Sequence, residues 1–148
     1  MNAAKLAALM SFSLVLAPYA LAADRAPAAK SAPLAAGYRG VALSVPSSRV
    51  EFLKPGDRVD VLCTFEAGLA DGTKQKVTAT ILQDVVVVGV RVGATPADPA
   101  AIEIQVNPNE AQYAALAQEQ GEVHFARRPA GDTRMTPMEM ASLRKLFK

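Results

Sequence analysis

The sequence is poor in the residues on which most metal, redox and nucleophilic sites depend. It contains one cysteine, one histidine and no tryptophan among 148 residues. The single cysteine, Cys63, cannot form a disulfide within the chain, so a disulfide scaffold is excluded. No pair of cysteine or histidine residues has the spacing of zinc ligands, and we expect neither a metal nor a cofactor.

Charged and aromatic side chains are also scarce. Charged residues make up 20% of the chain and aromatic residues 5%, and the formal net charge is +2. Such a balance, without aromatic stacking platforms, gives no reason to expect nucleic-acid binding. The hydrophobic fraction of 51% is enough for one small core, which we expect to consist of Val, Ile, Leu and Phe.

The N-terminal segment has the pattern of an export signal. Lys5 precedes an uncharged apolar run from Leu6 to Ala22, which ends in Ala20-Leu21-Ala22. We predict that residues 1–22 are a cleaved signal peptide that sends the protein to the periplasm, with an uncleaved membrane anchor as the alternative. Residues 23–36 are rich in Ala and Pro, and we predict a tether.

A sharp turn followed by an alternating strand is the clearest local signal. Pro55 and Gly56 suit the second and third positions of a type II turn, where the third residue has a positive φ. Four apolar side chains after the turn share one face of the predicted strand: Val59, Val61, Cys63 and Phe65. Arg58 and Asp60 fall on the other face, where they can meet as an exposed ion pair.

Further strands lie on both sides of this one. Tyr38–Val45 is predicted to be a strand that ends at Pro46, and Asp71-Gly72 indicates a hairpin. Lys76–Val92 is a long run that is apolar on both faces near its end, as in a central strand, and Gln83-Asp84 within it indicates a bulge or bend.

One helix is well specified between the last two strands. Ala101–Val106 alternates as a half-buried strand, and Asn107, Pro108 and Glu110 then supply an N-cap, a first-turn proline and a capping-box acid. We predict that the helix ends at Gly121 in the left-handed conformation. The last strand is predicted over residues 122–128.

The C-terminal region repeats the signals of a helix start. Thr136, Pro137 and Glu139 predict a short helix within residues 133–148. This helix either caps the body or docks on a partner through Met138 and Leu146. The whole sequence predicts an α+β fold, mostly β with one well-defined helix, as a small mixed sheet or a β-clip-like domain over residues 37–132.

No catalytic constellation is evident. For Cys/His nucleophilic catalysis the sequence offers one pair, Cys63 and His124. Their predicted strands point Cys63 inward and His124 outward, so the two side chains should not meet. Phosphate-binding glycine loops and nucleophile elbows are absent from the sequence. We therefore expect a protein that is not an enzyme.

Several of these segments together resemble a known family. The matching segments are residues 38–45, 54–61, 81–88 and 102–106, the last followed by Asn-Pro-x-Glu-Ala. Over residues 37–132 they are similar to the CpaB/RcpC domain of Flp (Tad) pilus assembly proteins. Five residues of the most specific block match this family, and we expect structural roles for them: Pro55, Gly56, Asp57, Arg58 and Asp60.

The resemblance implies a function. It suggests a non-enzymatic periplasmic factor in Flp pilus assembly and secretion, which contacts pilus assembly proteins, with the outer-membrane secretin as a candidate partner. Family members usually carry a SAF module before this domain, and only the predicted tether lies there in this sequence. Cell-wall binding by that module is therefore not carried over. The alternative is a periplasmic chaperone or ligand-binding module, such as a flagellar P-ring assembly chaperone.

Overall fold

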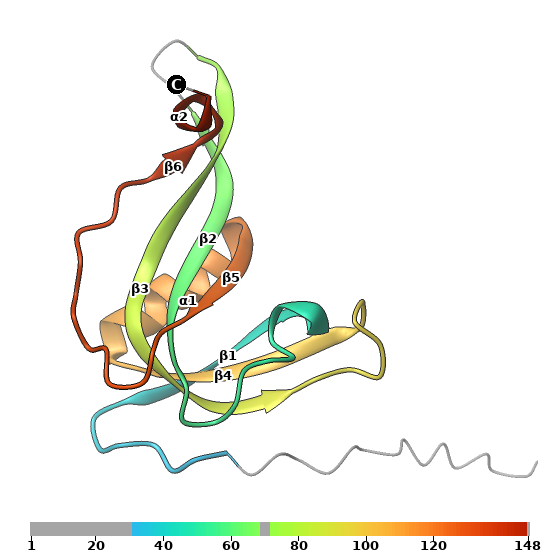
Figure 1. The fold of residues 1–148 in the computed structure, drawn as a ribbon, viewed down its shortest axis with the longest axis vertical. Helices are drawn as coiled ribbons and strands as arrows, with labels where there is room; N and C mark the ends of the chain where they lie inside the picture. Colours follow the sequence, from blue (N-terminus) through green and yellow to red (C-terminus); the bar gives the residue numbers. More distant parts are fainter. Residues whose placement is uncertain (1–30, 69–71, 148) are drawn as a thin grey trace, which may run out of the picture.

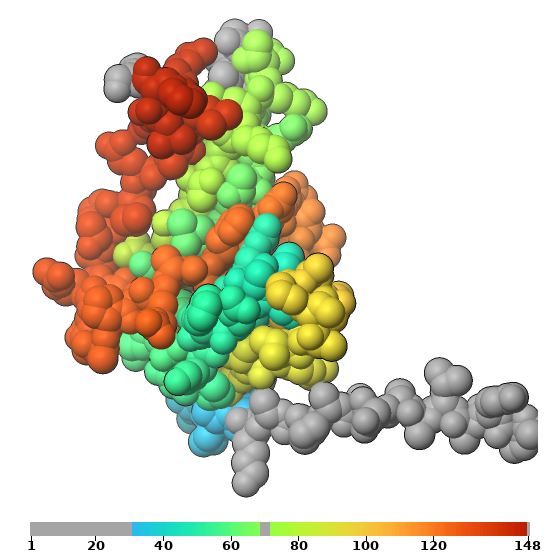
Figure 2. All heavy atoms as spheres, turned by 45° about the vertical axis from the view of Figure 1, so that its right-hand side comes forward, coloured from blue at the N-terminus to red at the C-terminus, as the bar shows by residue number. Residues whose placement is uncertain are grey.

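The computed structural model describes residues 31–68 and 72–147. The predicted signal peptide, residues 23–30 of the predicted tether and Asp71 of the predicted hairpin lie outside these ranges. Figure 1 shows a long hairpin that rises from a base of crossing strands, and Figure 2 shows the same hairpin standing above a packed body.

The described chain forms an antiparallel sheet with one main helix. The strands are β1 (Arg39–Pro46), β2 (Arg58–Gly68), β3 (Lys74–Arg91), β4 (Pro99–Val106), β5 (Glu122–Arg127) and β6 (Ala141–Ser142). The helices are α1 (Pro108–Gln120), the short α2 (Leu143–Leu146) and the 3-10 turn η1 (Ser47–Arg49). The sheet order is β1-β4-β3-β2-β5, with β6 also paired to β3. The α+β prediction is confirmed, whereas the mixed sheet is wrong because every pairing in the described residues is antiparallel.

The central strand β3 belongs to two parts of the molecule. Its residues 74–86 pair with β2, and residues 86–91 pair with β4. We call the β2–β3 hairpin the arm and the β1–β4 region the base (Figure 1). The sequence prediction of a central strand is confirmed, since Val85, Val87 and Val88 are all buried.

A bulge in β3 marks the junction of arm and base. Val59 pairs with Val85 and Val61 pairs with Leu82, so β3 has one residue more than β2 in this interval. Asp84 lies there with a φ of 60°, which is rare for a residue other than glycine. The predicted bulge at Gln83-Asp84 is therefore confirmed.

The core lies between the concave face of the sheet and α1. Ala114 and Ala117 are the buried residues of α1, and their small side chains let the helix approach the strands closely. The β2 alternation is confirmed, because Val59, Val61 and Cys63 are buried. Further fully buried side chains come from the other strands and loops: Leu43, Val50, Val77, Val87, Val88, Ile102, Ile104, Val106 and Val123.

The two ends of α1 are stabilised differently. At the start, Asn107 Oδ1 accepts from the backbone N–H of Glu110 at 2.9 Å, and Glu110 Oε2 accepts from Asn107 N–H at 2.7 Å, which confirms the capping box. At the end, Gly121 has a φ of −168°. The predicted left-handed conformation is therefore wrong. Glycine is needed for space, because a Cβ at residue 121 would lie 2.3 Å from the carbonyl oxygen of Thr64 on β2.

The C-terminal segment differs from the prediction in where its helix begins. A short helix is present, but α2 begins at Leu143 and residues 133–140 are outside any helix. We call residues 133–142 the strap. The backbone of Thr136 is engaged by the Gln83 side chain, so it cannot start the predicted helix. In Figure 1 the strap runs beside β3 from the base to the end of the arm.

The described end of the predicted tether lies on the base. The Ala32 N–H donates to the Val88 carbonyl at 2.7 Å, and the Ala35 N–H donates to Gln105 Oε1 at 2.8 Å. Gly89 gives this segment room, because a Cβ there would lie 2.9 Å from Ser31 Oγ. The described end of the predicted tether thus contacts the base, and the division into domains remains a prediction.

The first testable consequence concerns the turn before β2. Gly56 has a φ of 96°, as predicted, and a β-branched residue is strained in that conformation. We expect Gly56→Val to lower the free energy of unfolding by about 1 to 3 kcal/mol. Urea denaturation of the purified protein measures this loss.

Gly68→Val is the matched control. A Cβ at residue 68 meets nothing within 4 Å, and Gly68 does not have a positive φ. Its stability should stay close to that of the unsubstituted protein. Equal stability of the two variants would contradict the need for glycine in the turn.

Candidate functional site

The residues of the Pro-Gly-Asp-Arg-Val-Asp-Val block hold the start of β2 against β3. The Gly56 N–H donates to the Val87 carbonyl at 2.8 Å, and the Val87 N–H donates to the Asp57 carbonyl at 2.9 Å. The Asp57 side chain accepts from the Lys54 N–H at 2.9 Å, which closes the turn that contains Pro55. The contacts of Gly56 and Asp57 agree with structural roles.

Arg58 and Asp60 are not paired with each other, so the predicted exposed ion pair is wrong. Arg58 makes a bidentate contact with the carboxylate of Asp84. Asp60 instead accepts from Arg128 Nη1 at 2.7 Å and from the Asp84 N–H at 2.9 Å. The bulge explains the exchange of partners, since it turns Asp84 toward β2 between the two residues.

Arg128 is the centre of this charged group. Its side chain is only 8% exposed, and Asp84, Asp60 and Asp132 all lie within 4 Å of it. We call Arg58, Asp60, Asp84, Arg128 and Asp132 the bulge cluster. Because each carboxylate lies beside a guanidinium, these charges are compensated at low exposure.

Arg128 also ties the strap to the sheet. Its Nε donates to the Asp132 carbonyl at 3.1 Å, and its Nη2 donates to the Arg134 carbonyl at 2.6 Å. Next to it, Gln83 Nε2 donates to the Thr136 carbonyl at 2.8 Å and Gln83 Oε1 accepts from the Thr136 N–H at 3.0 Å. The bulge residues therefore organise the strap as well as the bend of β3.

The hydrogen bonds of the cluster shift its ionisation. The hydrogen bond from Arg58 lowers the pKa of Asp84 below its ordinary value, and the charges of Arg58 and Arg128 act in the same direction against the effect of burial. The hydrogen bond to Asp60 raises the pKa of Arg128. Asp84 and Arg128 thus stay charged at neutral pH, which suits an ion pair. A group that transfers protons would instead need a pKa near the working pH.

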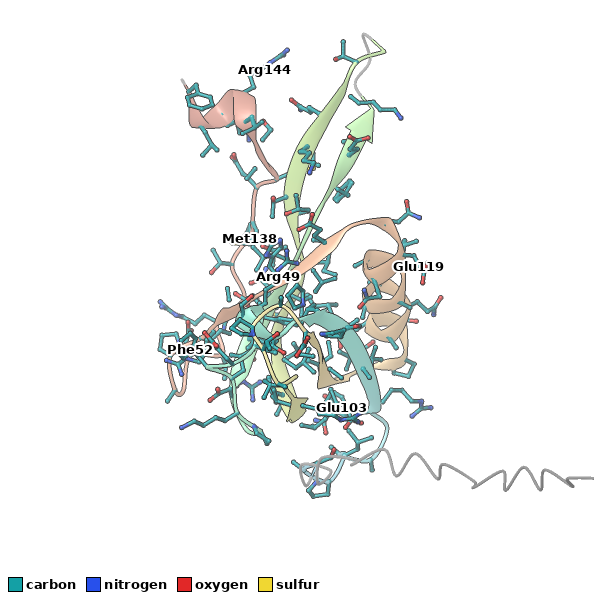
Figure 3. The ribbon with its side chains drawn as sticks, turned by 90° about the vertical axis from the view of Figure 1, so that its right-hand side faces the viewer. Arg49, Phe52, Glu103, Glu119, Met138 and Arg144 are labelled. Atoms are coloured by element: carbon teal, nitrogen blue, oxygen red, sulfur yellow. The ribbon has the colours of Figure 1, made fainter. Side chains whose placement is uncertain are left out.

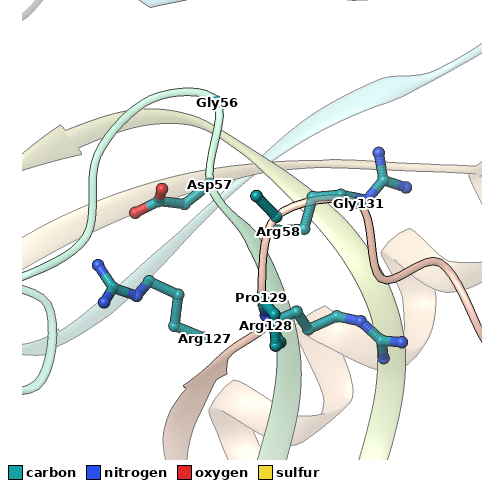
Figure 4. Close-up of a pocket in the computed structure, with 8 residues that line it drawn as sticks. Gly56, Asp57, Arg58, Arg127, Arg128, Pro129 and Gly131 are labelled. Atoms are coloured by element: carbon teal, nitrogen blue, oxygen red, sulfur yellow. The ribbon is translucent and has the colours of Figure 1, made fainter.

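An open depression lies beside the cluster. Its volume is about 580 Å³, and the turn before β2 and the loop after β5 line it (Figure 4). Arg58 and Arg128 are held by carboxylates, whereas the side chain of Arg127 makes no hydrogen bond or ion pair to any residue that the structure describes. In Figure 4, Arg127 extends on the same side as Asp57, away from Arg128.

Cys63 and His124 lie on neighbouring strands and opposite faces. Cys63 pairs with Val123 and His124 pairs with Leu62, and directly opposed residues share a face of the sheet. Burial raises the pKa of the Cys63 thiol, which lies 3.6 Å from the Ala117 carbonyl. Burial and the nearby charge of Arg49 lower the pKa of His124. His124 is therefore not placed to activate the thiol.

The two residues predicted to dock on a partner, Met138 and Leu146, lie outside the bulge cluster. Met138 is on the strap and is 56% exposed, and Leu146 is on α2 and is 70% exposed. No group of three or more His, Cys, Asp or Glu residues able to hold a metal ion occurs in residues 31–68 and 72–147. Within the same ranges, no helix is long and apolar enough to span a membrane.

Sequence reasoning identified the block around Asp57 but missed its partners. The sequence indicates Asp84 only as part of a bulge, and Arg128 only as the final residue of the last predicted strand. A signal for Asp84 is present, because it is the only acid within the apolar run of residues 77–90. Nothing in the spacing connects it with Arg128, which is 44 positions further along the chain.

The structure thus defines an antiparallel α+β domain with a partly exposed ion-pair network where β2, the bulge of β3 and the end of β5 meet. The family model described as "Flp pilus assembly protein RcpC/CpaB" matches residues 30–128. The chain belongs to this family, which is involved in Flp pilus assembly, and the resemblance seen in the sequence is confirmed. No curated protein and no solved structure matches it.

The lowered pKa of Asp84 predicts how stability depends on pH. A carboxyl whose pKa is lower in the folded state contributes stability above its unfolded pKa, near 3.9, and loses it as the pH falls through the folded value. Asp84→Asn should therefore lower the free energy of unfolding by about 1 to 3 kcal/mol at pH 7. The loss should shrink as the pH falls below about 4, where Asp84 of the unfolded chain becomes protonated while the folded carboxyl still holds its charge.

Urea denaturation between pH 3 and pH 7 checks this expectation. Asparagine tolerates a positive φ, so the substitution removes the charge without straining the bulge. Asp98→Asn is a suitable control on an exposed loop, because the Asp98 carboxylate accepts from the Thr95 N–H on its own loop and from no other described residue. A loss for Asp84→Asn that does not change with pH would contradict the proposed charge pairing.

Proposed function

We propose that the protein is a non-enzymatic periplasmic factor that supports Flp pilus assembly through contacts with other assembly proteins. The observation that carries this proposal is the family match, which covers β1 to β5 and α1. Because the family is involved in pilus assembly, contacts with components of that machinery follow from membership. The outer-membrane secretin is our candidate partner, and we propose no cell-wall ligand.

The distribution of exposed apolar side chains supports a role in binding. Six large ones gather in the last part of the chain, beyond the matched residues: Met135, Met138, Met140, Leu143, Leu146 and Phe147. Exposed apolar groups that cluster in this way are typical of binding surfaces. Methionine is flexible and polarizable, so it adapts to a partner's surface.

The absence of a catalytic role is supported by the functions found for the charged and nucleophilic residues. The bulge cluster is occupied in holding the strap and the bend of β3. Cys63 is buried beside α1, on the face opposite to His124. We infer that the exposed apolar residues of the strap and α2 serve protein contacts.

The periplasmic location rests on the predicted signal peptide. We expect the exported protein to begin at Ala23, because Ala20-Leu21-Ala22 has the small residues that signal peptidase requires. N-terminal sequencing of protein isolated from the periplasmic fraction checks this. Recovery of an intact N-terminus in the membrane fraction would instead support the membrane anchor.

Surface piliation tests the proposed contacts. Deletion of the gene should reduce surface pili without removing the pilin precursor. In a deletion strain that carries variant copies, we expect Met138→Lys or Leu146→Lys to lower piliation by about tenfold, since a few anchor residues carry most of the energy of an interface. Immunoblots of sheared pili and of whole cells provide the measurement.

Phe52→Lys is the matched control. Phe52 is 74% exposed, and it lies on a loop at the base, away from Met138 and Arg144 (Figure 3). It should leave piliation unchanged. Normal piliation in both variants of the C-terminal segment would contradict contacts there, and piliation in the deletion strain would contradict the assembly role. A gene neighbourhood with flagellar rather than secretin and prepilin genes would favour the chaperone alternative.

A further inference from the structure

One edge of β3 is only partly paired. β2 covers one edge of the strand along the arm, whereas on the other edge β6 pairs with Val77 and Thr78 and β4 begins to pair at Val86. No described strand pairs with residues 79–82 on this second edge, and no backbone hydrogen bond joins them to the strap. Main-chain donors and acceptors of the arm are therefore open between β6 and β4.

The strap already follows this edge in antiparallel register. Ala141 pairs with Thr78, and Thr136 is bound to Gln83, so five positions separate the two contacts on both segments. Residues 137–140 thus lie opposite residues 79–82 without pairing to them. In Figure 1 the strap bows away from β3 between its two attachment points.

Two side-chain properties explain why the strap does not complete the ladder. The Gln83 amide stands between the backbones of β3 and Thr136, so it holds the strap away from the strand at that end. Pro137, the next residue, has no N–H to donate. The edge of β3 is therefore left open by the chain that runs beside it.

We propose that residues 79–82 of β3 accept an extended segment of another pilus assembly protein as an added antiparallel strand. The edge recognises an extended backbone, because β6 is already seated on it in that form. Edge strands are usually protected from further pairing by charged side chains or proline. The open interval has neither, since it consists of Ala79, Thr80, Ile81 and Leu82. The strap then lies over the added strand.

The chemistry of the partner segment follows from the flanking side chains. Glu139 is the only acid opposite the open edge, and its carboxylate is paired with Lys145 at 2.8 Å. Met138 and Met140 are exposed on either side of it. An uncharged segment with apolar side chains fits these surroundings, since main-chain hydrogen bonds supply affinity and the side chains supply specificity. This inference rests on the proposed assembly role and identifies the kind of contact.

Paired cysteines test the open edge in the complete chain. In a Cys63→Ala background, Thr80→Cys with Glu139→Cys is bridged by a bifunctional thiol reagent that forms a reducible disulfide at each end, because the strap bows away from β3 and a direct disulfide needs adjacent backbones. This disulfide bridge joins the strap to β3 across the unpaired interval. Thr78→Cys with Ala141→Cys joins the two segments where β6 already pairs, so it leaves the interval open. We expect the first disulfide to lower surface piliation by about tenfold, with recovery on reduction, and the second to leave it unchanged.

A photo-crosslinking residue at Ala79, beside the disulfide position in the same interval, gives a second readout that does not depend on pili. We expect a crosslink to one uncharged segment of a pilus assembly protein, and the Thr80–Glu139 disulfide should abolish it. Normal piliation with both disulfides, loss with both, or a crosslink to a second copy of this chain would overturn the proposal. Pili in the gene deletion strain would instead contradict the assembly role. The crosslink would still show whether a segment binds at the open edge of β3.

Discussion

The ion pairs of Arg128 at the bulge of β3 are the interaction on which the rest of the structure depends. Four parts of the chain meet there: the end of β5, the start of β2, the bulge and the strap. A guanidinium with so little exposure is tolerated only when its donors are satisfied, and carboxylates and backbone carbonyls surround this one. Because the acceptors come from different segments, the hydrogen bonds and ion pairs of the Arg128 side chain hold all four parts together.

The bulge also divides β3 into a part that belongs to the core and a part that belongs to the arm. After the bulge, residues 86–91 of β3 pair with β4 and contribute to the core between the sheet and α1. Before the bulge, β3 extends from the body together with β2, and one of its edges is only partly paired. The matched family region ends with the body at residue 128, whereas the strap and α2 follow it. A stable scaffold and a more exposed contact region thus occupy successive parts of the chain.

Local structure could be predicted wherever neighbouring residues supply the cause. Asn107 and Glu110 cap α1 because the cap requires only the side chains and amides of one helical turn. Gly56 adopts a positive φ because the Pro-Gly turn is a property of adjacent residues. The alternation of Val59, Val61 and Cys63 predicted a buried face for the same reason, since a period of two follows from the geometry of a strand.

The sequence by itself therefore determined β1 to β5, the main helix, the turn and the family, through short-range geometry and residue order. Only the tertiary structure decided the partners of Arg58 and Asp60, because Asp84 and Arg128 approach them through a bulge and a sheet pairing between distant segments. It also decided why residue 121 is glycine, since the obstacle is a carbonyl on β2. The strap is extended at Thr136 for a similar reason. Its local signals favour a helix, but hydrogen bonds from Gln83 on another strand hold its backbone.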